Sequence, residues 1–394
     1  MIFRGRVFDG ETVLERAEVS VNEASGEIEY VDETRQGTNQ VNGKAIDRDI
    51  TVLPGLIDTH IHFFGTASHD LADWVLEPVE VLVVNSVNDA RHLIRAGFTT
   101  VRTLGDKVSL GLSRAEKVGS LYGPRIVSAG FSIAETGGDD DPKFLPYEVA
   151  KALSYSYYCD GPWECRKAVR LNIRNGAEAI KAYASRSFVG GGQIKPELTV
   201  EELSAIAEEA HRAHLKAAAH AYGEEAIRNT VDAGFDSVEH GLGLTEDLAE
   251  EIRKRGMFYT PTLSAYMRER RDRVPYRDEM IERHISREME IATGVGLRIA
   301  CGTDYVGTRT EPHGMNYREV LYLQRYLGPV GALRAATSTA ADCIGRPDLG
   351  RLARGKRGDI VVVSGDPTKD ASNLEPDRIL FVAKSGKTML ERGA

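Results

Sequence analysis

The chain has 394 residues, of which 42% are hydrophobic and 28% are charged. This composition is that of an ordinary globular protein, and the length is more than one average domain needs, although a barrel of about 250 residues or more is a known single unit. The net charge of −9 is moderate and spread along the chain, so it favours neither nucleic acid nor an anionic membrane as a partner.

The cysteines are few and scattered. Cys159 and Cys165 are close enough in sequence to form a disulfide, but the set of four, with Cys301 and Cys343, contains no Cys-x-x-Cys pair and favours reduced thiols. No apolar run reaches the 18 or so residues of a membrane span, and the first residues lack the features of a secretory signal. We therefore expect a cytoplasmic protein.

Both ends of the chain alternate short apolar runs with turn residues. Neither end is large enough to bury a core alone, so we expect residues 1–50 and 350–394 to pair into one small β-sandwich domain, which would also satisfy their strand edges. The predicted strands are 2–8, 17–21, 28–31, 360–363 and 379–383.

Between residues 51 and 349, apolar runs alternate with amphipathic stretches. In the clearest helix, over 199–214, Thr199 and Glu202 form a capping box. Eight such units predict a (β/α)8 TIM barrel, whose functional residues lie at the C-terminal ends of the strands. The runs are 53–63, 97–104, 124–130, 177–184, 215–220, 235–240, 257–261 and 297–304.

Two stretches of this region stand apart. Residues 131–162, rich in Gly, Asp, Pro and Tyr, form the only long irregular segment, and a loop of that length in a compact domain usually covers or binds a substrate. The arginine-rich run 268–273 is typical of a solvated helix face.

Polar residues follow five of the eight runs at the end where barrel chemistry occurs. Side chains alternate along a strand, so His60 and His62 project from one face and can bind one metal ion. Each of these residues alone has an ordinary structural interpretation, as a core histidine, a paired lysine or a helix cap. Their common position instead predicts a metal site made of His60, His62, Lys181, His220, His240 and Asp304.

These motifs resemble the amidohydrolase superfamily. The matching segments are 54–62 (Pro-Gly-Leu-Ile-Asp-Thr-His-Ile-His), Lys181, His220, 239–241 (Glu-His-Gly), 302–304 (Gly-Thr-Asp), 335–337, 350–352 and 355–361. The resemblance extends over essentially the whole chain. Within the superfamily the sequence is similar to the imidazolonepropionase-related metal-dependent hydrolases, and there to Xaa-Pro and Xaa-Arg/Lys dipeptidases, in which the fifth-strand ligand continues as His-Ala-Tyr, here 220–222.

The resemblance implies two divalent ions, with zinc as the expected metal. One would be held by His60, His62 and Asp304 and the other by His220 and His240, with Lys181, carboxylated by carbon dioxide, as the bridge. A buried lysine amine is easily neutralised and is then nucleophilic, which explains how Lys181 can become an anionic ligand.

The same resemblance implies hydrolysis by an activated water. Two metals lower the pKa of a shared water and polarise the carbonyl, and Asp304 passes the water's proton to the leaving nitrogen. Tyr222 lies two residues past His220 on the same strand face, where it can stabilise the oxyanion or hold a substrate carboxylate. A packing tyrosine is the alternative.

Three further residues are candidate substrate contacts. The related dipeptidases carry Gly-Gly-His after the third strand, whereas Asp139 follows Gly137-Gly138 here, and a carboxylate repels a substrate carboxylate. Asp139 and its neighbours suit a cationic group, an amide N–H or a neutral compound, unless the loop is simply solvated. Arg102 reaches either the rim or an ion pair at the barrel floor, and His313 lies on a loop that can contact substrate.

The sequence therefore predicts a binuclear metal-dependent hydrolase of an amide-type C–N bond in a dipeptide-like small molecule. The alternatives are a cyclic amide, as in imidazolonepropionase, and a xenobiotic amide, urea or carbamate; a non-catalytic scaffold ranks third. A deaminase is disfavoured, because those enzymes carry His-x-x-Glu where Gly223 stands and lack the lysine. The family also favours homo-oligomers.

Overall fold

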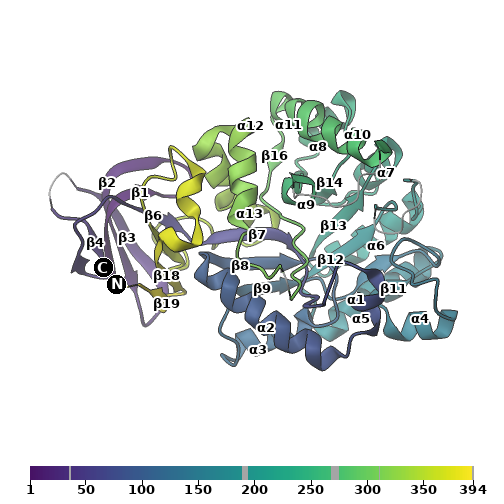
Figure 1. Ribbon diagram of the computed structural model, residues 1–394. Helices are drawn as coiled ribbons and strands as arrows, with labels where there is room; N and C mark the ends of the chain where they lie inside the picture. The colour runs from purple at the N-terminus through teal and green to yellow at the C-terminus, as the bar shows by residue number, and fades with distance from the viewer. Residues whose placement is uncertain (35–36, 189–193, 268–274, 310, 393–394) are drawn as a thin grey trace.

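The computed structural model describes residues 1–34, 37–188, 194–267, 275–309 and 311–392. The arginine-rich run 268–273 lies outside these ranges. A β-rich part built from both chain ends stands beside a larger part of alternating strands and helices (Figure 1).

The larger part is a TIM barrel in arrangement, with eight parallel strands. Each of the eight predicted apolar runs coincides with one of them to within a residue or overlaps it: β7 (Leu56–Ile61), β8 (Phe98–Thr103), β9 (Arg125–Ser128), β12 (Ala179–Tyr183), β13 (Lys216–Ala221), β14 (Ser237–His240), β15 (Phe258–Thr260) and β16 (Arg298–Ile299). Strands β7–β9 form one sheet and β12–β16 belong to another. Backbone hydrogen bonds join the sheets, from Thr59 N to Cys301 O (2.9 Å) and from Glu178 N to Ser128 O (2.7 Å).

Helices separate the barrel strands. They are α1 (Leu71–Leu76), α2 (Val79–Arg95), α3 (Ser109–Lys117), α4 (Tyr147–Leu153), α5 (Pro162–Asn175), α6 (Val200–Arg212), α7 (Glu224–Asp232), α8 (Glu246–Lys254), α9 (Leu263–Met267), α10 (Pro275–Arg283), the π-helix η1 (His284–Glu288), α11 (Met289–Val295), α12 (Tyr317–Ala335) and α13 (Ser338–Cys343). The predicted capping box of α6 is confirmed, with Thr199 and Glu202 each bonding the other's backbone N–H. Within the described ranges, no helix is both long and apolar enough to cross a bilayer.

The prediction that residues 131–162 form an irregular segment is wrong. They contain β10 (Ser132–Ala134), α4 and β11 (Ser156–Tyr158), and β10 pairs in parallel with both β11 and β12. Ile133 lies opposite Ala182, next to the candidate ligand Lys181. The segment is therefore an added edge of the barrel sheet, and its short strands escaped prediction because turn residues separate them.

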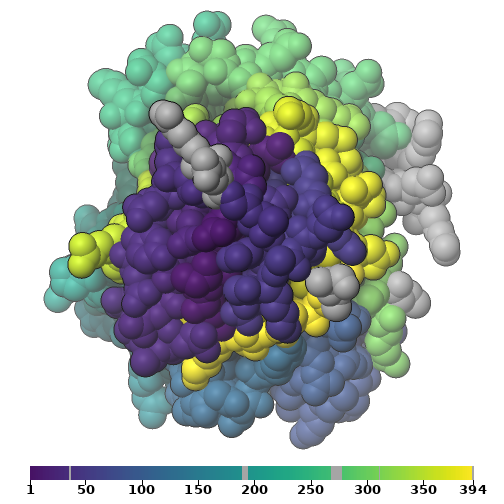
Figure 2. Space-filling view, turned by 90° about the vertical axis from the view of Figure 1, so that its left-hand side faces the viewer, coloured from purple at the N-terminus to yellow at the C-terminus, as the bar shows by residue number. Residues whose placement is uncertain are grey.

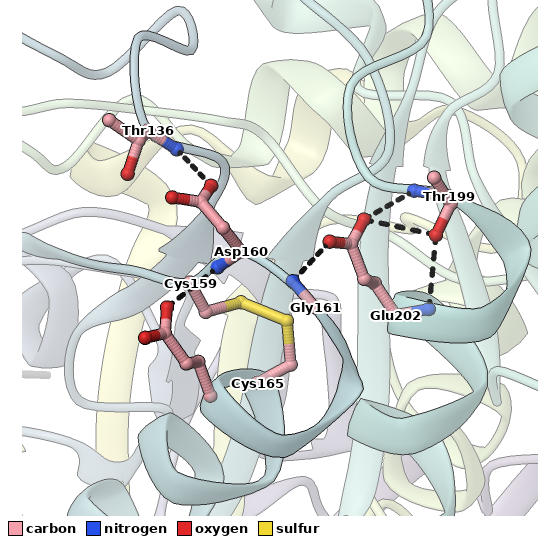
Figure 3. Close-up of a disulfide and its surroundings, with 8 residues drawn as sticks. Thr136, Cys159, Asp160, Gly161, Cys165, Thr199 and Glu202 are labelled. Atoms are coloured by element: carbon pink, nitrogen blue, oxygen red, sulfur yellow. Dashed lines mark hydrogen bonds between the residues drawn. A yellow bond between two sulfur atoms is a disulfide. The ribbon is translucent and has the colours of Figure 1, made fainter.

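The expectation of four reduced cysteines is wrong, because Cys159 and Cys165 form a disulfide (Figure 3). Cys159 follows β11, the chain turns at Gly161, and Cys165 lies in the first turn of α5, which brings the two Cα atoms to 5.0 Å. The linked turn also holds Asp160, whose carboxylate accepts the Thr136 N–H at 3.1 Å. Cys301 and Cys343 are buried free thiols.

The two chain ends meet in a single nine-stranded sheet. In Figure 2 the purple N-terminal residues and the yellow C-terminal residues adjoin on one face of the molecule. The strands are β1 (Ile2–Phe8), β2 (Val13–Asn22), β3 (Glu27–Glu33), β4 (Gln40–Val41), β5 (Lys44–Ala45), β6 (Ile50–Pro54), β17 (Ile360–Ser364), β18 (Ile379–Lys384) and β19 (Lys387–Glu391), and the short 3₁₀ turns η2 (Ala371–Leu374) and η3 (Pro376–Arg378) precede β18. The sheet joins strands of both chain ends, and Phe3 of β1 packs on Phe381 of β18 with ring centroids 5.1 Å apart, although β6 and β17 lie between these strands in the sheet.

The central strands of this sheet are buried on both faces. Val52 and Val362 belong to the small domain's own core, whereas their neighbours Leu53 and Val363 pack into the main core of the barrel. The predicted strand over 53–63 is in fact two strands, β6 and β7, which meet at Gly55. A Cβ at Gly55 would overlap the side chain of Thr99, so only glycine allows the chain to pass this close to β8.

Candidate active site

The six candidate metal ligands line one cavity of about 210 Å³ at the C-terminal ends of the barrel strands. His60 lies in β7 with His62 just beyond it, Lys181 lies in β12, His220 in β13, His240 at the end of β14, and Asp304 shortly after β16. Parallel strands end at one rim, which is why residues up to 244 positions apart meet here.

The tightest group is His60, His62 and Asp304, which offer one ligand atom each, all within 4.8 Å of one another. The Nε2 atoms of His62 and His60 lie 3.1 and 3.5 Å from the Oδ1 atom of Asp304. Burial alone would raise the pKa of Asp304, but the hydrogen bond from His62 and the nearby charges of His60 and Lys181 hold it below its ordinary value. Asp304 is therefore an ionised acceptor at neutral pH.

Hydrogen bonds to the far ring nitrogens fix how the histidines face the cavity. The Nδ1 atom lies 2.8 Å from Gly105 O in His62, 2.9 Å from Glu239 Oε2 in His60, and 2.7 Å from Thr262 Oγ1 in His240. In each ring, Nε2 is thereby left for another partner. This is the usual arrangement of metal-binding histidines, whose orientation is set by such outer hydrogen bonds.

His220 and Lys181 complete the cavity floor. The Nε2 atom of His220 is buried without a hydrogen-bond partner, and the ring lies 4.5 Å from that of His240, centroid to centroid. Burial lowers the pKa of Lys181 to about 8 and the pKa of His220 well below its ordinary value, so neutral forms are accessible to both. An orphaned imidazole nitrogen beside neutral nitrogens and a carboxylate fits divalent metal ions.

Three residues around the floor have left-handed backbone conformations. The φ angles of His240, Thr262 and Asp304 are 67°, 50° and 53°. Non-glycine residues rarely adopt such angles, and they concentrate at functional sites, where the surrounding structure must enforce them. All three stand at or beyond the ends of barrel strands: His240 and Asp304 line the cavity, and Thr262 bonds the Nδ1 atom of the His240 ring.

A buried ion pair lies beneath the floor. The guanidinium of Arg102 donates to Glu239 at 2.7 Å and to Thr59 O at 2.6 Å, and both side chains are fully buried. Burial opposes the charge of Glu239, but Arg102 and His60 together lower its pKa below the ordinary value. The structure thus places Arg102 in the floor ion pair, one of the two positions that the sequence allows, and outside the cavity lining.

The other two substrate candidates also lie outside the cavity lining. The carboxylate of Asp139 accepts hydrogen bonds from the backbone N–H and the hydroxyl of Ser187. His313 lines a separate cavity and lies behind the ligand strand, with its Nε2 atom 3.0 Å from His62 O. Asp139 and His313 therefore touch the site through other residues.

Tyr222 does line the cavity, and its hydroxyl lies 2.8 Å from that of Tyr266. Sequence reasoning missed most of the remaining lining, which is largely aromatic. The additional residues are Phe64, His69, Trp74, Asp140, Tyr155, Tyr183, Ser187, Phe188, Ala265, Tyr266 and Val306. The sequence offered a signal for Phe64, Tyr183 and Val306, each two residues after a candidate ligand, and for Asp140, next to Asp139.

The sequence from residue 51 to 389 matches the model of the amidohydrolase family. The chain therefore belongs to this family, whose members are hydrolases that act on C–N bonds, and the barrel, the added domain and the rim histidines agree with that membership.

Individual relatives cover most of the chain. Ochratoxinase of Aspergillus niger is 28% identical over 85% of this chain and 75% of its own length, and its crystal structure matches with a TM-score of 0.89 over 100% and 96% of the two chains, at 24% identity. An imidazolonepropionase of Anaeromyxobacter dehalogenans is 25% identical, over 86% of this chain and 82% of its own. A crystal structure of a Xaa-Pro dipeptidase with bound methionine in its active site has a TM-score of 0.83 and 29% identity over 99% of both chains.

Proposed function

We propose that this protein is a binuclear metal-dependent amidohydrolase that cleaves an amide-type C–N bond in a dipeptide-like substrate of the Xaa-Pro or Xaa-Arg/Lys type. The observation that carries the proposal is the convergence of imidazole nitrogens on one cavity, with His220 Nε2 buried and unpartnered. A buried polar atom without a partner is costly, and a metal ion would satisfy it.

In this proposal, His60, His62 and Asp304 would hold one divalent ion and His220 and His240 the other, with zinc as the expected metal. Lys181, once carboxylated on Nζ, would be an anionic ligand shared by the two ions. Burial lowers the pKa of the Lys181 amine to about 8, so a neutral amine is available to attack carbon dioxide and release one proton. The bound ions would supply a water of lowered pKa and polarise the scissile carbonyl.

The side chains of the cavity then move protons and orient the substrate. Asp304 accepts the proton of the attacking water and delivers it to the leaving nitrogen. Its left-handed backbone and its contact with His62 keep the carboxylate at the cavity floor. The hydroxyl of Tyr222, paired with that of Tyr266, donates to the oxyanion that forms at the substrate carbonyl.

The substrate assignment has support from the Xaa-Pro dipeptidase structure, which aligns over 99% of both chains. A second candidate has its own observation: the curated relative ochratoxinase and the imidazolonepropionase point to a xenobiotic amide or a cyclic amide. The aromatic cavity lining is compatible with a ring-bearing substrate of either kind.

Metal analysis combined with a substrate panel tests the proposal. Protein purified without chelators should hold two transition-metal ions per chain, and mass spectrometry of the native protein should show one carbon dioxide adduct. Xaa-Pro, Xaa-Arg and Xaa-Lys dipeptides, imidazolonepropionate, and aryl amides, ureas and carbamates form the panel. Less than one ion per chain, with no turnover after addition of zinc and bicarbonate, would instead favour a non-catalytic scaffold.

The proposal includes a homo-oligomer in the cytoplasm. Light scattering coupled to size-exclusion chromatography measures the assembly, and a monomer at micromolar concentration would refute that part alone.

A further inference from the structure

We propose that Asp140, together with the rings of Phe64, Trp74 and Tyr155, forms a subsite for a protonated amine of the substrate. We call these four residues the acidic–aromatic wall. The inference rests on the proposed function, because it names the chemistry that an amide substrate presents on one side of the scissile bond.

The first observation is the environment of Asp140. Its carboxylate lines the cavity and is 95% buried, and it accepts hydrogen bonds from Tyr155 (2.9 Å), Ser156 (2.7 Å) and Ser132 (3.3 Å). All three donors are neutral hydroxyls. Among the residues that the structure describes, no lysine or arginine forms an ion pair with Asp140.

A buried carboxylate that faces a cavity with neutral donors alone retains an uncompensated charge. Burial raises the pKa of Asp140 to about 6, which still leaves it ionised at neutral pH. The ammonium of Lys181 is a nearby positive charge. A cationic group entering the cavity would supply the missing partner through a charge-assisted hydrogen bond.

The second, independent observation is the set of rings that packs with Tyr155, whose hydroxyl bonds this carboxylate. Phe64 and Trp74 stack at 4.6 Å with an interplanar angle of 7°, and Tyr155 stands edge-on to Phe64 at 4.9 Å. Phe64 stacks against both Trp74 and His62, so the rings act by excluding water beside the carboxylate, which strengthens a hydrogen bond between charged groups there. Tyr155 connects the two halves of the wall, because its ring packs on Phe64 while its hydroxyl bonds Asp140.

The wall also adjoins the candidate metal ligands. The ring of Phe64 stacks on that of His62, with the centroids 5.5 Å apart and an interplanar angle of 15°. A group bound at the wall would therefore lie beside the candidate metal ligands. A carboxylate in that position would be repelled by Asp140, so the wall selects for an amine and against an acid.

The neighbouring acids of the same loop behave differently. Asp139 is bonded by Ser187, and Asp141 accepts the backbone N–H of Gly137 at 2.9 Å. Neither lines the cavity, although both are buried. The carboxylates of Asp139 and Asp141 therefore have a structural role, since both accept hydrogen bonds that stabilise the loop. The carboxylate of Asp140 also faces the cavity, where a substrate would bind.

Calorimetric titration with phenethylamine and its neutral isostere 2-phenylethanol tests the subsite without turnover. The metal-loaded protein should bind the amine at least about tenfold more tightly, as expected for a hydrogen bond between charged groups. Equal affinities would overturn the proposal. This difference in affinity between the amine and the alcohol should disappear in Asp140→Asn and persist in the matched control Asp141→Asn. An amine bound to a metal ion would keep its advantage over the alcohol in Asp140→Asn. If the affinity difference persists in that variant, the proposed subsite is therefore also wrong.

If Asp140→Asn does not fold, Trp74→Leu provides the second variant, since it keeps the carboxylate and removes one ring. The gap between amine and alcohol should narrow, and an unchanged gap would contradict the role of the rings.

Kinetics separate this inference from the proposed function. Dipeptides with a free amino group should exceed their N-acetyl counterparts in kcat/KM by at least about tenfold. Hydrolysis of both at equal efficiency would refute the subsite and keep the hydrolase. A preserved amine-binding gap without hydrolysis of any amide would refute the hydrolase and keep the subsite.

Discussion

Replacing Glu239 with glutamine should destabilise the protein and weaken metal binding together. One oxygen of Glu239 accepts from Arg102 and the other lies 2.9 Å from His60 Nδ1, and the side chain is fully buried. Glutamine has the same shape but no charge, so the guanidinium of Arg102 is left buried without a counter-ion. Breaking one side of such a buried pair costs about 3–5 kcal/mol.

For a chain of this length, that loss corresponds to a fall in melting temperature of about 4–6 °C, since the entropy of unfolding is roughly 2 cal/mol/K per residue. The folded-state pKa of Glu239 lies below its ordinary value. Its contribution to stability is therefore complete above the unfolded pKa of about 4.3 and is lost as the pH falls through the folded value. Measurements at pH 7 report all of it.

Scanning calorimetry at pH 7 and metal titration measure the two effects. The affinity for the ion next to His60 should fall by about 10- to 100-fold, the usual result of removing an outer hydrogen bond to a ligating histidine. Glu251→Gln is the matched control, because Glu251 forms an ion pair of the same length, 2.7 Å, with Arg255 on the surface. That variant should leave both quantities almost unchanged. If Glu239→Gln had the same melting temperature and the same metal affinity as the control, the reasoning from burial would be wrong.

The remaining predictions concern catalysis, metal, pH and the disulfide. Asp304→Asn should lower kcat by about 10²- to 10⁴-fold, and undiminished turnover would rule out its proton-transfer role. Chelation should abolish turnover and lower the melting temperature, and zinc with bicarbonate should restore both; a chelated protein that is verified metal-free yet active would contradict the metal assignment. Glu197, just before α6, accepts the backbone N–H of Asp139 at 2.7 Å, and burial raises its pKa to about 8. The wild type should therefore lose stability as the pH rises from about 4.5 to 8, and Glu197→Gln should flatten this slope in melting curves; parallel curves would refute it. Serines at Cys159 and Cys165 should lower the free energy of unfolding in urea by about 2 kcal/mol, and no change would show that the disulfide is dispensable.

The barrel strands and their terminal polar residues could be predicted because local rules determine both. Short continuous apolar runs mark strands that are buried on both faces, and parallel strands bring their C-terminal ends to one rim regardless of sequence separation. His60 and Asp304 could therefore be placed at the same rim although 244 positions separate them in the chain.

Features that depend on the path of a loop could not be predicted in the same way. Residues 131–162 carry no strong periodicity, so neither β10 nor the pairing of Cys159 with Cys165 follows from the sequence alone. The same path decides that Asp140 faces the cavity while Asp139 faces Ser187. A shift of one residue along such a loop reverses which acid meets the substrate.

The pairing of β17 with β6 makes the order of synthesis relevant to folding. β6 runs directly into β7, the strand that carries His60, and all five of its residues are buried. One edge of β6 pairs with β1, but the other has to wait until residues 360–364 leave the ribosome. During that interval β6 is an exposed apolar edge, and polypeptides that stop before β17 keep it permanently, which is the kind of surface on which nascent chains aggregate.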